Sequence, residues 1–246
     1  LAAPSRGRRH RPRLRPPFGT GCGPPHDMAT QVKICGLTEA EHVEQAGRLG
    51  AAYLGFVFYP PSPRAVDPAR ARELAAASPA SAATVGLLVD ASDHEIETIL
   101  SAVPLDVLQL HGYETAERVA EIGLRFGCRT IKALRIEAAD DLANLTEHAD
   151  AADMILFDAK PPRDAAWPGG HGLPFDWRLL EGRTPRPPWL LAGGLTAANA
   201  GAAVTLTRAP ILDVSSGVES RPGVKDLGKL EAFFAAVARA DEDSVR

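Results

Sequence analysis

Two residues of the sequence end short apolar runs and belong to types that transfer protons. Cys35 closes the run VKIC and Asp158 closes the run MILFD. A thiolate can remove a proton, and a carboxyl group can deliver one. A lone cysteine is more commonly a buried structural residue, and an aspartate in this position can instead cap a helix. Lys160 and the two prolines after it open a helix poorly, which favours proton transfer by Asp158.

Glycines and small hydroxyl residues near the end of the chain form a candidate anion site. They lie in two runs, LAGGL at 191–195 and DVSSGVE at 213–219. Glycine lets the backbone approach a ligand closely, and the N–H groups at a helix start favour a phosphate. The run TAANAGAAVTL directly after LAGGL has the composition of such a helix. A single Gly-Gly pair would indicate only a tight turn, but two such runs together favour phosphate binding. The predicted phosphate-binding residues are Gly193, Gly194, Ser215, Ser216 and Gly217.

Three further polar residues lie in or just past apolar runs and could contact a ligand. Arg64, in PPSPRAV, is flanked by prolines that stiffen its loop, so its guanidinium could be aimed at a carboxylate. His111 follows the run VLQL, and Asp213 lies within ILDVS. A surface arginine and a structural histidine fit the same patterns, and both interpretations stay open here. Lys33 lies two residues before Cys35 and so shares one face of that strand.

All these residues belong to, or follow, runs that have the character of buried strands. Such runs alternate with Ala- and Glu-rich stretches of helical period, as in TEAEHVEQAGRLG and DHEIETILSAV, which is typical of parallel strands joined by helices. The eight strand candidates are VKIC (32–35), AYLGFVF (52–58), TVGLLV (84–89), DVLQL (106–110), TIKAL (130–134), MILFD (154–158), WLLAG (189–193) and ILDVS (211–215).

Eight apolar strands, each followed by a helix, predict a single-domain α/β fold of the (β/α)8 TIM-barrel class. Strands buried on both faces suit a closed barrel better than an open doubly wound sheet, although the pattern alone leaves that alternative open. In such barrels, function gathers at the C-terminal ends of the strands. The polar residues named above should therefore converge on one mouth.

Composition narrows the classes of function. The chain has 246 residues and a net charge of -4, and residues 1–27 carry six arginines against one aspartate, so the remainder is acidic. An acidic body argues against nucleic-acid binding, and no apolar run reaches the roughly 18 residues of a membrane span. Three scattered cysteines indicate neither disulfides nor a zinc site, which favours the cytoplasm. We expect residues 1–27 to be a disordered basic extension, such as an artefactual or upstream-translated start. Residues 28–246 should be the catalytic domain.

Taken in order, seven runs of the sequence resemble the phosphoribosylanthranilate isomerase family of tryptophan biosynthesis. The resemblance covers nearly all of residues 31–240, and the ordered set is far more specific than any one run. The runs are KICGLT, GFVFYPPSPRAV, VLQLHG, ILFDAK, GGHGLPFDW, LLAGGL and ILDVSSGVE.

The resemblance implies an Amadori rearrangement of a phosphosugar–anthranilate substrate, without metal or organic cofactor. By position in the family's runs, Cys35 would remove the C2 proton and Asp158 would protonate the furanose ring oxygen. Arg64 would pair with the anthranilate carboxylate, and Asp213 would steady the anthranilate amino group. Gly194, Ser215, Ser216 and Gly217 would hold the phosphate. The assembly would be a monomer or a homodimer.

The sequence departs from the family pattern in one loop, and two other functions stay open. His171, Leu173 and Pro174 replace small hydroxyl and charged residues often seen before FDW, which puts contacts of that loop in doubt. A bifunctional or histidine-pathway phosphosugar isomerase is the nearest rival, and the latter would carry aspartate in place of Cys35. A non-catalytic phosphate-binding barrel is the alternative of a different class.

Overall fold

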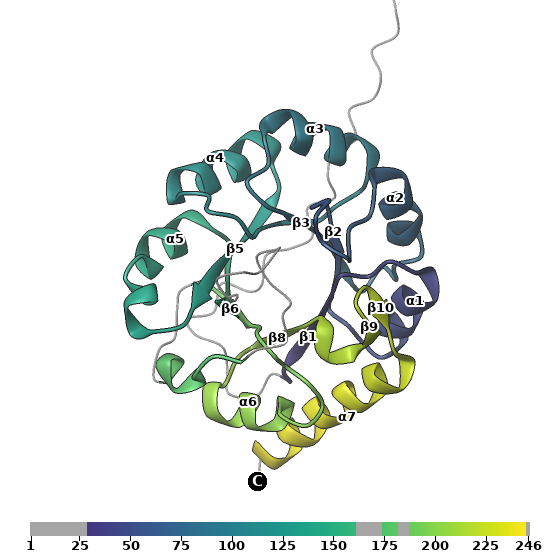
Figure 1. Ribbon diagram of the computed structural model, residues 1–246, viewed down its shortest axis with the longest axis vertical. Helices are drawn as coiled ribbons and strands as arrows, with labels where there is room; N and C mark the ends of the chain where they lie inside the picture. Colours follow the sequence, from purple (N-terminus) through teal and green to yellow (C-terminus); the bar gives the residue numbers. More distant parts are fainter. Residues whose placement is uncertain (1–28, 161–173, 182–186, 245–246) are drawn as a thin grey trace, which may run out of the picture.

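The structure is a computed structural model that describes residues 29–160, 174–181 and 187–244. Its centre is a closed barrel of eight parallel strands in the order β1-β2-β3-β4-β5-β6-β7-β8, surrounded by helices (Figure 1). Closure occurs where β1 pairs with β8, with Lys33 opposite Asp213. The predicted (β/α)8 TIM barrel is therefore confirmed, and the open-sheet alternative is wrong. Residues 1–27 and His171, to which some predictions refer, lie outside the described residues.

All eight predicted strands form, each within two residues of its expected ends. They hold because their apolar side chains are buried on both faces, as parallel strands between a core and a helix layer must be. Their bounds are β1 Gln31–Cys35, β2 Tyr53–Val57, β3 Ala83–Leu88, β4 Val107–Leu110, β5 Arg129–Ile136, β6 Met154–Ala159, β7 Trp189–Leu191 and β8 Ile211–Val214.

The surrounding helices begin at residues suited to capping. Asp67 accepts a hydrogen bond from the backbone N–H of Arg70, and Ser92 forms a reciprocal capping box with Glu95. Gly127 ends one helix in the left-handed conformation. The α-helices are α1 Ala40–Arg48, α2 Pro68–Ala76, α3 Asp93–Ala102, α4 Ala116–Phe126, α5 Leu145–Ala151, α6 Ala200–Thr207 and α7 Leu227–Ser244, and the 3-10 helices are η1 Ala139–Leu142, η2 Trp177–Leu180 and η3 Ser216–Val218.

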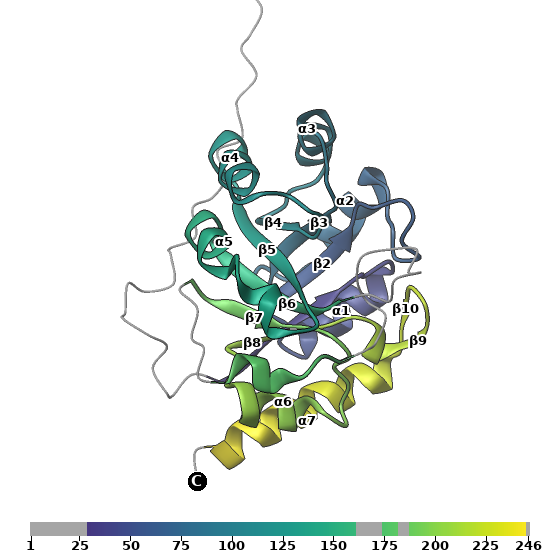
Figure 2. The ribbon, with the colours of Figure 1, turned by 60° about the vertical axis from the view of Figure 1, so that its left-hand side comes forward.

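Apolar side chains fill the molecule in two layers, one inside the barrel and one between the barrel and its helices. Alternate residues of each strand supply the two layers. Figure 2 shows α6 and α7 side by side against one part of the barrel wall. The inner layer consists of Tyr53, Val85, Val107, Ile131, Ala133, Met154, Leu156, Leu190, Ala192 and Ile211.

Three features of the chain differ from the simple strand–helix repeat. Between β6 and β7 the described residues contain the 3-10 helix η2 and no α-helix. A short antiparallel hairpin, β9 Glu219–Arg221 with β10 Val224–Lys225, follows β8 and was not predicted. The segment before β1 is tied to α7, because both the backbone N–H and the hydroxyl of Thr30 donate to the carboxylate of Asp241, at 2.8 and 2.6 Å.

None of the helices in the described ranges is both long enough and apolar enough to cross a lipid bilayer.

Candidate active site

The two predicted carboxylates of the mouth face into the barrel. Leu156 and Ile211 belong to the inner layer, and side chains two residues apart on a strand point the same way. Asp158 and Asp213 therefore stand one level above them, toward the C-terminal ends of β6 and β8. Both are buried, with 6% and 8% of their surface exposed. The barrel thus brings carboxylates from distant parts of the sequence to one mouth.

Cys35 ends β1, and its thiol is buried beside a glycine of the neighbouring strand. A methyl group built on Gly55 of β2 would lie 3.3 Å from Cys35 Sγ and 3.3 Å from Lys33 Nζ, so both atoms lie over this glycine. Burial raises the pKa of the Cys35 thiol, although the ammonium groups of Lys33 and Lys225 act in the opposite direction. The two cations near the thiol are the feature that Cys35 shares with reactive cysteines.

Asp213 and Lys33 form a buried ion pair across the β1–β8 seam. Lys33 Nζ donates to Asp213 Oδ1 at 2.8 Å, and the lysine has no exposed surface. Burial alone would lower the pKa of Lys33, but the Asp213 carboxylate and the Cys35 thiol group together outweigh it and the pKa is raised. The inward position predicted for Lys33 is confirmed.

Asp158 contacts its own backbone and a histidine. Its Oδ1 accepts a hydrogen bond from the N–H of Ala159 at 2.9 Å, and its Oδ2 lies 3.3 Å from His111 Nε2. That second contact lacks the alignment of a hydrogen bond, and we regard it as an ion-pair distance only. The amide nitrogen of Gln109 lies 2.9 Å from His111 Nδ1. Asp158 does not cap a helix among the described residues, so the proton-transfer interpretation keeps its geometric support.

Arg64 is buried rather than a surface arginine, and it is held by a carboxylate that the sequence did not single out. Its Nε and Nη2 donate to the two oxygens of Glu219 in the β9 strand, at 2.8 and 2.9 Å. Lys225 Nζ donates to the same carboxylate at 2.8 Å. Burial would raise the pKa of Glu219, but the two cations outweigh it and the pKa is lowered. The hairpin therefore fixes the direction of the guanidinium.

The predicted phosphate loops touch each other at the ends of β7 and β8. Gly193 and Gly194 have φ of +87° and +65°, a conformation that side-chain-bearing residues rarely adopt. A methyl group on Gly217 would stand 1.8 Å from the carbonyl oxygen of Leu195, so only glycine fits where the two loops meet. The two loops are thus in direct contact.

Side chains fix these loops to the rest of the mouth. Asn199 donates to the carbonyl of Gly194 at 2.9 Å and accepts from the N–H of Thr196 at 2.7 Å. The helix α6 begins at residue 200, later than the predicted helix start. The hydroxyl of Ser215 donates to the carbonyl of Cys35 at 3.0 Å. Ser216 begins η3. The predicted phosphate loop after β8 is therefore directly connected to the strand that carries the thiol.

Comparison with known families decides the class of protein. A family model described as N-(5'phosphoribosyl)anthranilate (PRA) isomerase matches residues 32–236. The chain belongs to this family. Among curated relatives, the N-(5'-phosphoribosyl)anthranilate isomerase of Paracoccus denitrificans is 55% identical over 208 residues, which cover 85% of this chain and 97% of the relative. The enzyme of Nitrobacter hamburgensis is 52% identical over 219 residues, with 89% and 97% covered.

Solved structures of the PRA isomerase family share the fold. Phosphoribosyl anthranilate isomerase from Thermotoga maritima superposes with a TM-score of 0.77 at 33% identity and covers 85% of this chain and 99% of its own. A further isomerase structure, in complex with reduced 1-(o-carboxyphenylamino)-1-deoxyribulose 5-phosphate, has a TM-score of 0.74 at 31% identity, with 85% and 99% covered. Monomers generated from the dimeric Thermotoga maritima enzyme match as well.

Glu219 and Lys225 lie beside predicted site residues, but the sequence analysis did not select them. Glu219 is the last residue of the predicted anion-binding run DVSSGVE, and RPG at 221–223 carries a turn signal that could have indicated a hairpin returning Lys225 to it. Gln109, a polar residue of the fourth predicted strand, lies two residues before His111, so alternation places both on one face. Among the described residues, no group of three or more His, Cys, Asp or Glu side chains could hold a metal ion.

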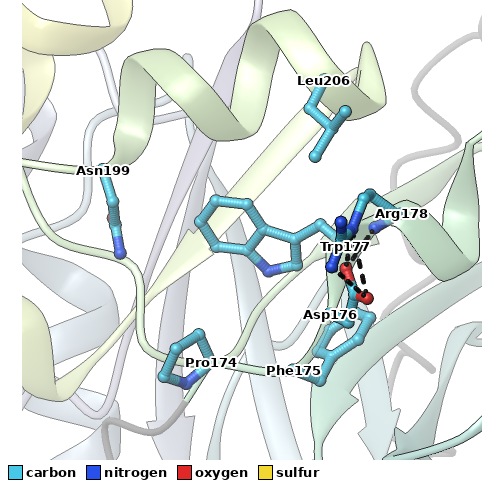
Figure 3. Close-up of a pocket in the computed structure, with 7 residues that line it drawn as sticks. All are labelled: Pro174, Phe175, Asp176, Trp177, Arg178, Asn199 and Leu206. Atoms are coloured by element: carbon cyan, nitrogen blue, oxygen red, sulfur yellow. Dashed lines mark hydrogen bonds and ion pairs between the residues drawn. The ribbon is translucent and has the colours of Figure 1, made fainter.

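A shallow pocket also lies outside the barrel, between η2 and the α6 region (Figure 3). Trp177 stands at its centre, and Arg178 and Asp176 form an exposed ion pair at 2.9 Å beside it. None of the predicted site residues lines this pocket, so it is separate from the mouth. Its lining residues are Pro174, Phe175, Asp176, Trp177, Arg178, Asn199 and Leu206.

Proposed function

We propose that this chain isomerises N-(5-phosphoribosyl)anthranilate to 1-(2-carboxyphenylamino)-1-deoxyribulose 5-phosphate in tryptophan biosynthesis. The observation that carries the proposal is the convergence of Cys35 and Asp158, from the first and sixth strands, on the mouth of a barrel whose family performs this reaction. The phosphate of the substrate binds the loops of Gly193, Gly194 and residues 215–217.

The rearrangement is an Amadori reaction that uses separate acid and base groups. Asp158 gives its proton to the furanose oxygen while the ring C1–O bond breaks and the nitrogen lone pair forms a C1=N bond. The Cys35 thiolate then removes the C2 proton, which yields an enolamine. When the enolamine becomes the ketone, C1 gains the proton carried by Cys35 and the O2 hydroxyl returns one to Asp158. Both groups end as they began, so protons balance over the cycle.

The remaining predicted residues orient the substrate. Arg64 pairs with the anthranilate carboxylate, and the bidentate contact with Glu219 supports this role because it fixes the guanidinium. Asp213 steadies the anthranilate amino group. His111 lies beside the general acid Asp158 and contacts the substrate there. For assembly we propose a monomer or homodimer, and for location the cytoplasm, which suits the free thiols of Cys35 and Cys128.

The test measures decay of phosphoribosylanthranilate fluorescence by the purified chain and two variants. Cys35→Ala and Asp158→Asn should each lower kcat by about 10²-fold or more, because each removes one proton-transfer group. Both should still bind the reduced product analogue. Cys128→Ala is the matched control, since this free cysteine lies before β5, at the opposite end of the barrel, and should leave turnover unchanged. Near wild-type turnover in Cys35→Ala would show that the base assignment is wrong.

A further inference from the structure

A buried lysine inside the barrel has no role in the mechanism above. Lys33 has no exposed surface and pairs in register with Tyr53, a member of the apolar inner layer. Removing an ammonium group from water is costly, and replacing a buried ion pair by well-packed apolar residues is often neutral or stabilising. An apolar side chain would fill this level of the barrel at lower cost. The position of the charge therefore calls for a functional explanation.

The ammonium group of Lys33 lies beside the thiol of the proposed base. Lys33 and Cys35 are two residues apart on β1, and their Nζ and Sγ atoms lie over the same glycine of β2, each 3.3 Å from the place of a methyl group there. The groups that act on the thiol come from three strands: Lys33 on β1, Asp213 on β8 and Lys225 on β10. Two of these are cations, and Asp213 is the opposing anion.

We propose that Lys33 is a positioning residue that stabilises the thiolate of Cys35, and that Asp213 limits this effect by sharing the lysine. This proposal rests on the proposed function, in which the thiolate of Cys35 acts as the base. Because Asp213 pairs with Lys33 at 2.8 Å, its negative charge offsets part of the effect of the ammonium group on the thiol. Loss of Lys33 should therefore disfavour the thiolate, whereas loss of the Asp213 charge should favour it.

These opposite signs give a test that needs no substrate. In a Cys22→Ser, Cys128→Ser background, the rate of Cys35 alkylation by iodoacetamide is followed against pH by mass spectrometry. Lys33→Met should move the midpoint of the curve of alkylation rate against pH to higher pH, and should slow alkylation at neutral pH about tenfold. Asp213→Asn should move the midpoint to lower pH. The acidic limb of kcat/KM against pH should move in the same direction as each midpoint.

Two further variants protect the test against a folding defect. Lys33→Met leaves a buried carboxylate without its partner, so the double variant Lys33→Met, Asp213→Asn removes both charges. Its midpoint should lie above that of Asp213→Asn alone. If Lys33→Met does not fold, this second comparison tests the proposal in its place. Lys132→Met is the matched control, because Lys132 is also a buried lysine in an ion pair, with Glu114 at 2.6 Å, and does not act on Cys35. Its midpoint should stay unchanged.

An unchanged or lowered midpoint in Lys33→Met, or a raised midpoint in Asp213→Asn, overturns the proposal. Because alkylation is measured without substrate, this failure is distinct from failure of the isomerase assay. A chain that isomerises nothing could still show the shifts, and an active isomerase could lack them.

Discussion

At the scale of single residues, the candidate acid and base differ in their surroundings. Cys35 lies in a buried position with two lysines nearby, whereas Asp158 lies beside a histidine. Burial of the thiol raises its pKa, so the reactive thiolate is the minor form until the pH approaches that raised value.

The activity of the enzyme should therefore rise with pH. The base is active when deprotonated, and a raised pKa places its ionisation on the alkaline side of the range where an ordinary thiol titrates. We expect kcat/KM to increase from neutral pH into the mildly alkaline range, measured by substrate fluorescence at constant ionic strength. A decrease over that interval would argue against Cys35 as the base.

Glu219 should contribute stability that depends on pH. Its pKa is lowered in the folded chain by Arg64 and Lys225, so its contribution is present above the pKa of the unfolded chain and is lost as the pH falls through the lowered value. Glu219→Gln removes the carboxylate charge that Arg64 and Lys225 share, and should lower the free energy of unfolding by about 3 kcal/mol at neutral pH, measured with urea. The difference from wild type should shrink in acid.

Glu73→Gln is the control for this prediction, since Glu73 forms an exposed ion pair with Arg70 at 2.8 Å. Such pairs contribute about 0–1 kcal/mol. Equal losses in the two variants would mean that the Glu219 cluster adds no particular stability.

Sequence position selected the candidate side chains but not their partners. Cys35 and Asp158 could be found because each ends an apolar run. The pairing of Arg64 with Glu219 joins residues 155 positions apart, and no local pattern encodes such a contact. Lys33 was placed on the correct face, although its ion pair with Asp213 required knowledge that β1 closes on β8.

At the scale of elements, the proposed phosphate loops depend on their close approach to each other. Gly217→Ala would place a methyl group against the carbonyl oxygen of Leu195 and push the two loops apart. We expect KM for the phosphorylated substrate to rise about tenfold or more, because the backbone donors lose their common alignment. Gly123→Ala in α4 is the control, since its methyl group meets only ordinary contacts at 3.6 Å. That variant should keep KM and gain up to about 1 kcal/mol of stability.

Strands were more predictable than the connections between them. Eight apolar runs marked the eight strands because both faces of each strand are buried. The β9–β10 hairpin escaped because strands of three and two residues have too little periodicity to detect. Between β6 and β7 the 3-10 helix η2 replaces the expected regular helix in the described residues, and Pro-rich sequence on both sides gives a physical reason.

At the scale of the whole molecule, the described barrel starts after the basic first segment. The family model begins at residue 32, and Thr30 already contacts α7. We expect a chain that starts at Met28 to fold and to keep the kcat/KM and unfolding midpoint of the longer chain, measured by fluorescence assay and thermal melting. A marked loss of either would show that residues 1–27 contribute to the enzyme.

The contact between Thr30 and Asp241 also indicates that the chain can be circularly permuted. The start of the first strand and the last turns of the final helix lie within reach of one side chain, so a short glycine-rich linker could join them. New ends could then be opened in a surface loop distant from the mouth, such as the one between α4 and β5. A circularly permuted enzyme of this kind should retain its barrel, because the order of strands around the ring does not depend on where the chain begins.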